Sequence, residues 1–189
     1  MTLIVGYVDE NGNGHMAADS NGTSVDYHAT QEYKASKIFT IGDGKFLIGY
    51  TTSFRMGQII EHCFIPPPHV EGISNVKYMI NEFMPKLIQS FRDNRYILDT
   101  EKSGGTFLVY YNGSLFKIYN DFQIQETVNN FDACGSGEMQ ALASFNTIKL
   151  YDKWNENIEL HLNNIIKIVS ENNITVRGRI DYLTVLLEN

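Results

Sequence analysis

Three turns that contain an Asn-Gly or Asp-Gly step constrain this sequence more than any other feature. They lie at residues 9–14, 42–44 and 112–114, and each separates two apolar runs. Asn-Gly and Asp-Gly favour the tight turns that join neighbouring antiparallel strands. The flanking runs predict strands at 3–8, 15–18, 36–41, 45–50, 106–111 and 115–119. The chain is therefore expected to fold into β-hairpins.

Helical patterns occur in pairs between these hairpins. Ser53 can cap a helix that continues to about residue 64, before three consecutive prolines stop it. A second helical period runs from about 75 to 95, and Pro85 is expected to kink it. The remaining elements are predicted as a short strand near 131–133, helices at about 137–151 and 155–171, and a last strand at 182–187.

This order of elements selects a fold class. A doubly wound parallel sheet alternates single strands with single helices, so grouped hairpins and paired helices exclude it. The order instead favours an α+β fold, a four-layer αββα sandwich in which helix pairs flank two antiparallel sheets. No linker, repeat or low-complexity segment divides the chain, so one domain spanning residues 1–189 is expected.

Composition limits the class of partner. The formal net charge is −7 and no long run of Lys and Arg interrupts it, which argues against nucleic acid. The sequence shows neither a signal peptide nor an apolar stretch approaching a membrane span. Cys63 and Cys134 are the only cysteines, so a cytoplasmic protein with reduced thiols is expected. The five histidines lack ligand spacing, and neither metal nor cofactor is expected.

Thr2 stands directly behind the initiator methionine, a context that favours removal of Met1. The exposed α-amine would have a pKa of about 7.7 to 8 and could accept the proton of the threonine hydroxyl, which is a poor nucleophile without a base. Thr2 would then be nucleophile and base in one residue. Such a site also needs a cation, a carboxylate that fixes the cation, and a donor to the tetrahedral oxyanion.

Five segments in register resemble proteasome β-subunits and the bacterial peptidase HslV. They are Thr-Leu-Ile-Val-Gly at 2–6, Ala-Ala-Asp-Ser at 17–20, Lys-Ala-Ser-Lys-Ile at 34–38, Ile-Gly-Tyr at 48–50 and Cys-Gly-Ser-Gly-Glu at 134–138. No single segment is specific, but together they cover most of the chain and match the hairpin and helix-pair order. The resemblance implies an N-terminal-nucleophile hydrolase fold.

The resemblance also implies roles for individual residues. Thr2 would be the nucleophile and base, Asp19 the carboxylate that orients the lysine, and Lys34 the cation, on a strand of the second hairpin. Lys37, three residues further on, is expected to face the opposite side. Ser136 matches the serine that bonds the terminal amine.

Two positions depart from the family pattern. The segment after the fourth strand usually ends in small residues, often a glycine whose amide forms the oxyanion hole, whereas Tyr-Thr-Thr-Ser stands here at 50–53. Backbone amides of Thr51 or Thr52 are the candidates for that donor. The later aspartate of the family would fall near Asn172 and Asn173, so an amide replaces the carboxylate.

Each candidate also has a purely structural interpretation. Thr2 can be an ordinary second residue, Asp19 the start of an Asx-turn, Lys34 a solvated charge on a strand, and Ser136 a helix cap. Ser136 as a serine-hydrolase nucleophile is rejected, because Cys134 and Glu138 stand where the elbow motif needs glycine. Cys134 is expected to be a buried apolar residue.

The functional prediction is a threonine peptidase that hydrolyses peptide bonds through Thr2. The resemblance implies a homo-oligomeric ring that takes peptides or unfolded proteins, supplied by a separate ATP-driven unfoldase. Two alternatives remain open. One is an inactive scaffold, inhibitory or assembly protein that retains Met1, and the other is a small-molecule amidohydrolase of the N-terminal-nucleophile class.

Overall fold

Two antiparallel sheets form the centre of the molecule, and the predicted hairpins supply most of their strands. The computed structural model describes residues 2–24, 29–96, 104–150 and 154–188, so Met1 and Tyr151 lie outside the described residues. The first sheet has the order β10-β1-β2-β11, from Phe131–Gly135, Leu3–Val8, Gly14–Asp19 and Ile180–Val185. The second has the order β5-β6-β7-β8-β9, from Ile38–Ile41, Phe46–Tyr50, Phe107–Tyr111, Ser114–Ile118 and Ile124–Glu126.

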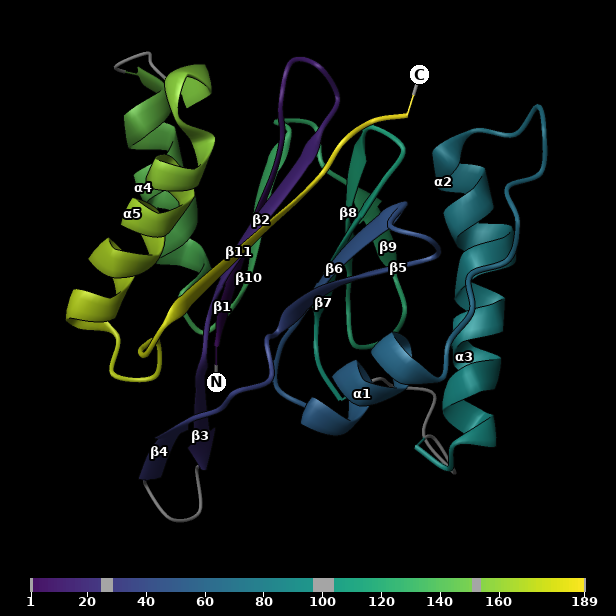
Figure 1. Ribbon diagram of the computed structural model, residues 1–189, viewed down its shortest axis with the longest axis horizontal. Coiled ribbons are helices and arrows are strands. Elements are labelled where there is room, and N and C mark those ends of the chain that lie inside the picture. Colours follow the sequence, from purple (N-terminus) through teal and green to yellow (C-terminus); the bar gives the residue numbers. More distant parts are fainter. Residues whose placement is uncertain (1, 25–28, 97–103, 151–153, 189) are drawn as a thin grey trace.

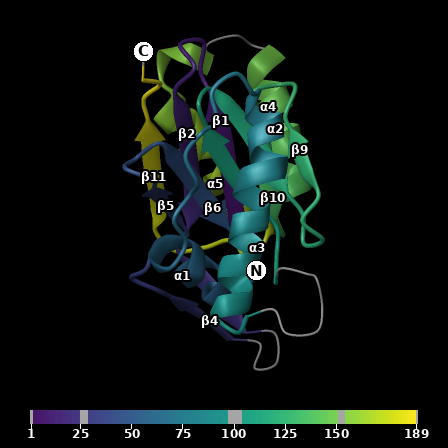
Figure 2. The ribbon, with the colours of Figure 1, turned by 90° about the vertical axis from the view of Figure 1, so that its right-hand side faces the viewer.

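Helices cover the outer face of each sheet (Figure 1). On one side α4 (Glu138–Leu150) and α5 (Ile158–Asn172) pack on the first sheet, and a short 3₁₀ turn at Trp154–Glu156 lies between them in the chain. On the other side α1 (Phe54–His62), α2 (Asn75–Tyr78) and α3 (Met84–Asp93) pack on the second sheet, and Figure 2 shows α2 and α3 in front of its strands. The four-layer αββα sandwich is confirmed.

Three apolar layers hold the sandwich together, because strand side chains alternate between the two faces of a sheet. Leu3, Val5 and Tyr7 of β1 face α4 and α5, whereas Ile4 and Val8 face the second sheet. On the far side, strand residues of the second sheet meet α1 to α3 in an aromatic-rich cluster. β1 lies inside its sheet, with β10 on one side and β2 on the other.

The long helix predicted over 75–95 is interrupted rather than simply kinked. α2 continues into a π-helical turn at Met79–Phe83, in which the Met84 amide donates to the Met79 carbonyl. Pro85 is the second residue of α3 and closely follows the π turn, with Phe83 and Met84 still in helical conformation. Proline lacks the N–H that a regular helix would use, and the π turn is the local change of hydrogen bonding that precedes it.

Three strands escaped the sequence analysis. β3 (Asn21–Ser24) and β4 (Ala29–Glu32) form a two-stranded ribbon, and β9 (Ile124–Glu126) is a short strand at the edge of the second sheet. The β3 and β4 sequences, Asn-Gly-Thr-Ser and Ala-Thr-Gln-Glu, lack an apolar face. No helix in the described ranges is both long and apolar enough to cross a membrane.

A buried lysine on β8, far from Thr2 in the sequence, connects the two sheets. Lys117 of β8 is 4% exposed. Its Nζ donates to the Ala133 carbonyl at 2.8 Å, to Glu138 at 2.7 Å and to Asp132 at 3.3 Å. The carboxylates raise the pKa of Lys117 against the opposing effect of burial. The cluster ties β8 to β10 and to the start of α4.

Candidate active site

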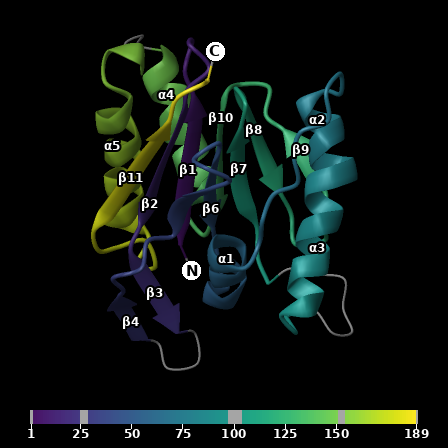
Figure 3. The ribbon, with the colours of Figure 1, turned by 45° about the vertical axis from the view of Figure 1, so that its right-hand side comes forward.

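Thr2 lies just before β1, at the end of the sheets from which β3 and β4 extend (Figure 3). It is 2% exposed, so the hydroxyl is inside the protein rather than on a loose chain end. β1 is paired on both sides, and its first residue, Leu3, lies opposite Gly135 of β10. These pairings fix the backbone that carries Thr2.

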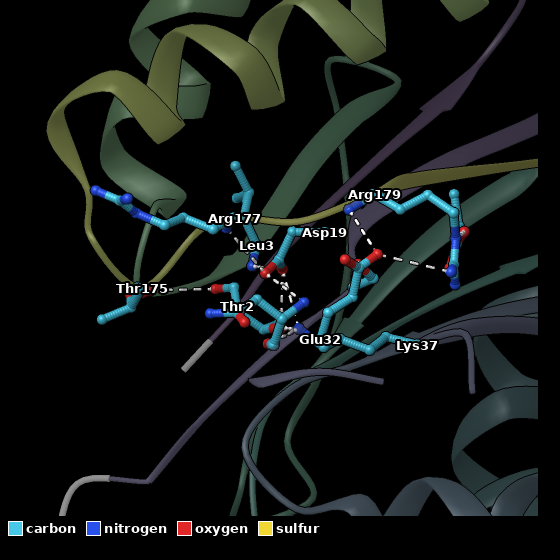
Figure 4. Close-up of polar contacts among 12 residues, drawn as sticks. Thr2, Leu3, Asp19, Glu32, Lys37, Thr175, Arg177 and Arg179 are labelled. Atoms are coloured by element: carbon cyan, nitrogen blue, oxygen red, sulfur yellow. Dashed lines mark hydrogen bonds and ion pairs between the residues drawn. The ribbon is translucent and has the colours of Figure 1, made fainter. Parts of the chain in front are cut away.

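Lys37 and Asp19 meet at the Thr2 hydroxyl (Figure 4). Thr2 Oγ1 donates to Asp19 Oδ1 at 2.9 Å and accepts a hydrogen bond from Lys37 Nζ. Lys37 Nζ also donates to Asp19 Oδ1 at 3.1 Å and to the Asn21 carbonyl at 2.5 Å. An ammonium has three N–H donors, and all three have acceptors here.

The lysine lies in a strongly desolvated place. Lys37 is 3% exposed and Asp19 is fully buried. Burial lowers the pKa of Lys37 below its ordinary 10.5, and the carboxylates of Asp19 and Asp181 act against that shift. An isolated buried ammonium would be costly, so the paired carboxylate is what keeps the charge in this position. A lysine with a lowered pKa can share the hydroxyl proton or stabilise the alkoxide.

Asp19 is held by main-chain donors from three parts of the chain. Its Oδ1 accepts from the Leu3 amide at 2.9 Å, and its Oδ2 accepts from the amides of Asn21 at 3.3 Å and Arg177 at 3.4 Å. These three N–H donors fix the position of the Asp19 side chain. Asp19 thus makes more contacts than an Asx-turn would require.

The structure places Lys37, rather than the predicted Lys34, beside Thr2 and Asp19. Lys34 is exposed in the bend between β4 and β5, whereas Lys37 stands directly before Ile38, where β5 begins. The Tyr50 amide donates to the Lys37 carbonyl at 3.0 Å and so continues the β5-β6 ladder by one residue. Because regular strand pairing stops at Lys37, the alternation of side chains along β5 does not predict which way Lys34 points. Lys37 is buried, and the expectation that it faces away from Thr2 is wrong.

Ser136 meets the main chain of Thr2. Its amide donates to the Thr2 carbonyl at 2.8 Å, and its hydroxyl contacts the same oxygen at 3.3 Å. Gly135 has a φ of +107°, and a Cβ there would overlap the Thr2 carbonyl oxygen. Glycine is required because both its conformation and this close approach exclude a side chain. α4 begins two residues after Ser136, at Glu138.

Thr175 and Asn173 belong to the same network, and the sequence analysis missed Thr175. Ser136 Oγ lies 2.7 Å from Thr175 Oγ1, which donates to Asn173 Oδ1 at 2.7 Å. Asn173 Nδ2 donates in turn to the Ser136 carbonyl at 3.0 Å. The amide side chain uses both its donor and its acceptor here, which a carboxylate could not do. A threonine in a loop carries no sequence signal of its own.

The two candidate oxyanion donors differ. The Thr51 amide already donates to the Thr106 carbonyl at 3.1 Å, and the Thr51 hydroxyl donates to the same oxygen at 2.7 Å. Thr51 is therefore engaged in the fold. Thr52 has a φ of +69°, is exposed and lines a cavity next to Thr2. Of the two candidates, Thr52 remains the one that can face a substrate.

Cys134 is a poor candidate for a second nucleophile. It is buried, and burial raises the pKa of its thiol well above the usual range, which disfavours the thiolate. Within the described ranges, no group of three or more His, Cys, Asp and Glu side chains could hold a metal ion. The groups that meet at Thr2 are a hydroxyl, an ammonium and a carboxylate.

Comparison with known proteins identifies the fold. Neither a protein-family model nor a curated protein matches this sequence. Solved structures do match. BPH from Thiobacillus denitrificans in complex with epoxomicin aligns with a TM-score of 0.76 and 18% identity, over 100% of both chains. HslV from Trypanosoma brucei aligns with a TM-score of 0.68 and 14% identity, over 97% of this chain and 98% of that one.

Anbu from Yersinia bercovieri, described as an ancestral β-subunit, aligns with a TM-score of 0.66 and 15% identity. The alignment covers 98% of this chain and 82% of that one. At these identities the likeness is one of fold. The resemblance noted in the sequence is thus confirmed at that level: the chain has the fold of the proteasome-like N-terminal-nucleophile hydrolases.

Proposed function

We propose that this protein is an N-terminal threonine hydrolase that cleaves peptide bonds after Met1 has been removed. One observation carries the proposal: the Nζ of buried Lys37 contacts both the Thr2 hydroxyl and the Asp19 carboxylate. A threonine that merely began a strand would need neither a buried cation nor a buried carboxylate. Burying this pair is costly, and activation of a hydroxyl is the chemistry that it serves.

The proposed reaction is acyl transfer followed by hydrolysis. The free α-amine of Thr2 takes the hydroxyl proton while Oγ1 attacks the carbonyl carbon of the substrate. Lys37 stabilises the developing negative charge on Oγ1, and the Thr52 amide donates to the oxyanion. The protonated α-amine then gives its proton to the departing amine, which leaves an ester on Oγ1. Water hydrolyses the ester, releases the acid and restores the hydroxyl.

The fold comparisons support a peptidase over other amide-cleaving activities. HslV and the ancestral β-subunit Anbu share the fold, and BPH was solved with epoxomicin. On this basis we extend the proposal to a homo-oligomeric ring, to peptides or unfolded proteins as substrates, and to an ATP-driven unfoldase as partner. A cytoplasmic location is part of it, supported by the free thiols of Cys63 and Cys134. A monomer in light scattering would remove the ring.

The test is the intact mass of the purified protein, with and without a peptidyl epoxyketone. We expect loss of Met1 and one covalent adduct. Thr2→Ala should abolish the adduct, whereas Thr40→Ala, an exposed threonine on β5, should leave it unchanged. Retained Met1, or a free Thr2 that does not react, would support the inactive scaffold instead. Turnover of simple acyl amides but not of peptides would support a small-molecule amidohydrolase.

A further inference from the structure

A small cavity opens beside the nucleophile. It is lined by Thr2, Asn21, Gly22, Lys37, Tyr50, Thr52 and Phe54. In the proposed reaction Oγ1 of Thr2 becomes bonded to the acyl carbon, so the group attached to that carbon must occupy the space next to Thr2. The cavity that Thr2 lines is therefore the natural place for the acyl side chain of a substrate.

The volume of this cavity is about 30 Å³. Pockets for larger ligands usually exceed about 300 Å³, so this cavity is small. A methyl group fits a space of this size. The isobutyl group of leucine or the benzyl group of phenylalanine does not fit unless a wall moves.

Aromatic rings close the cavity. Phe54, the first residue of α1, packs on the Tyr33 ring with centroids 5.0 Å apart and meets the Tyr50 ring edge-on at 6.2 Å. Tyr50 is itself buried, and a Cβ at Gly57 of α1 would overlap its ring. The two rings are therefore packed on both sides, and Tyr50 cannot turn away without displacing α1.

Gly22 forms another part of the wall. A Cβ at this position would overlap the Tyr33 ring and would lie 3.2 Å from Phe54 Cζ. The absence of a side chain lets Tyr33 and Phe54 lie directly over the main chain of β3. The two rings fill the space that the missing side chain of Gly22 leaves, so this space does not enlarge the cavity.

The wall also carries an unsatisfied donor. Asn21 is 4% exposed, and its Nδ2 atom is buried without a hydrogen-bond partner among the described residues. A buried amide N–H without an acceptor is unfavourable. Asn21 is therefore a residue of the wall whose donor is left unused by the described part of the fold.

We propose that the site selects substrates with a very small side chain, glycine or alanine, on the acyl side of the cleaved bond. Phe54, supported by Tyr33, sets the limit. This inference rests on the proposed function, because it needs Thr2 to form the acyl bond. It assigns the substrate class through these particular aromatic residues.

The test compares peptidyl epoxyketones that differ only in the side chain next to the ketone, alanine, leucine or phenylalanine. The rate of adduct formation on Thr2 is followed by intact mass. For the wild-type protein we expect the alanine compound to react at least about tenfold faster than the leucine compound, since a single methylene group changes selectivity by about 10- to 200-fold.

Phe54→Ala should raise the leucine-to-alanine rate ratio by about tenfold or more. Phe122→Ala is the matched control, because both rings are partly buried and pack on the same apolar cluster, and it should leave the ratio unchanged. Tyr33→Ala is a second test variant. Tyr33 is 41% exposed, so its loss should not prevent folding, and the ratio should rise in the same direction.

The outcomes separate the two proposals. No adduct with any of the compounds would overturn the threonine hydrolase function, and this inference with it. Adducts that form equally fast with alanine, leucine and phenylalanine would overturn only the size limit. An alanine preference that neither Phe54→Ala nor Tyr33→Ala changes would remove these rings as its cause.

Discussion

Replacing Lys37 with methionine tests the centre of the site directly. Methionine is unbranched and similar in length, so it fills the space but supplies no N–H. Three acceptors then lose a donor: Thr2 Oγ1, Asp19 Oδ1 and the Asn21 carbonyl. The matched control is Lys34→Met, which removes the same charge from an exposed position in the same segment.

The expected loss of stability in Lys37→Met follows from the hydrogen bonds that Asp19 keeps. Removing one partner of a buried ion pair costs about 3 to 5 kcal/mol. Asp19 retains the Thr2 hydroxyl and the amides of Leu3, Asn21 and Arg177. Because these donors still stabilise the carboxylate, we expect about 3 kcal/mol for Lys37→Met. Lys34→Met should change the free energy of unfolding by less than about 0.5 kcal/mol.

Urea unfolding measures this difference, followed by the fluorescence of Trp154. Trp154 is the single tryptophan, 7% exposed and packed edge-on against Tyr7 and Phe145. The rate of Thr2 labelling should fall by about 10²- to 10⁴-fold in Lys37→Met. Labelling at the wild-type rate would refute the role of Lys37. Loss of labelling in Lys34→Met instead would restore the cation predicted from the sequence.

The pH dependence gives a second readout of the same residue. The pKa of Lys37 is lowered by folding, so between that lowered value and 10.5 the unfolded chain binds more protons than the folded one. The free energy of unfolding of the wild type, relative to Lys37→Met, should therefore rise with pH across this interval and level off above it. A difference that falls with pH there would contradict the sign of the shift.

Two further predictions concern residues outside the Thr2, Asp19 and Lys37 triad. Lys117→Met should cost about 3 kcal/mol in urea unfolding, at the low end for a buried pair because Asp132 and Glu138 are partly exposed. The pKa of Lys117 is raised by folding, so its contribution to the free energy of unfolding should be constant below pH 10.5 and should fall as the pH rises above that value. This direction is opposite to that of Lys37. A fall that begins at neutral pH would contradict the prediction. Gly135→Ala should destabilise by more than about 2 kcal/mol and slow Thr2 labelling, because the Cβ overlaps the Thr2 carbonyl as well as straining the backbone. Gly44→Ala, also at positive φ but with nothing within 4 Å, should cost only the strain of about 1 kcal/mol, and equal losses in the two variants would show that the overlap is unimportant.

The fold was predictable because its signals are local. The Asn-Gly and Asp-Gly turns and the apolar periods each depend on a few neighbouring residues, and they gave the hairpins, the helix pairs and the αββα class. β3 and β4 were missed because their sequences carry no apolar face. The π turn before Pro85 was missed because a proline inside a helical period normally indicates a kink.

The site was predictable only in part, because its contacts join distant residues. Thr2, Asp19 and Ser136 were placed by their order along the chain, and the structure brings all three together. The choice between Lys34 and Lys37 depends on where the β5-β6 ladder ends. The hydrogen bond from the Tyr50 amide to the Lys37 carbonyl sets that end. Thr175 reaches Ser136 from 39 positions away, and no local pattern marks it.

The main-chain N–H of Arg177 donates to Asp19, and this contact limits when the site can form during synthesis of the chain. Thr2 and Asp19 leave the ribosome well before Arg177 and its neighbour β11, which pairs with β2, because Arg177 is made 158 residues after Asp19. Contacts of such long sequence separation form late in folding. A nascent chain therefore carries Thr2 and Asp19 before the Arg177 amide can hold the carboxylate, and the full set of contacts around Thr2 forms only after β11 has been made.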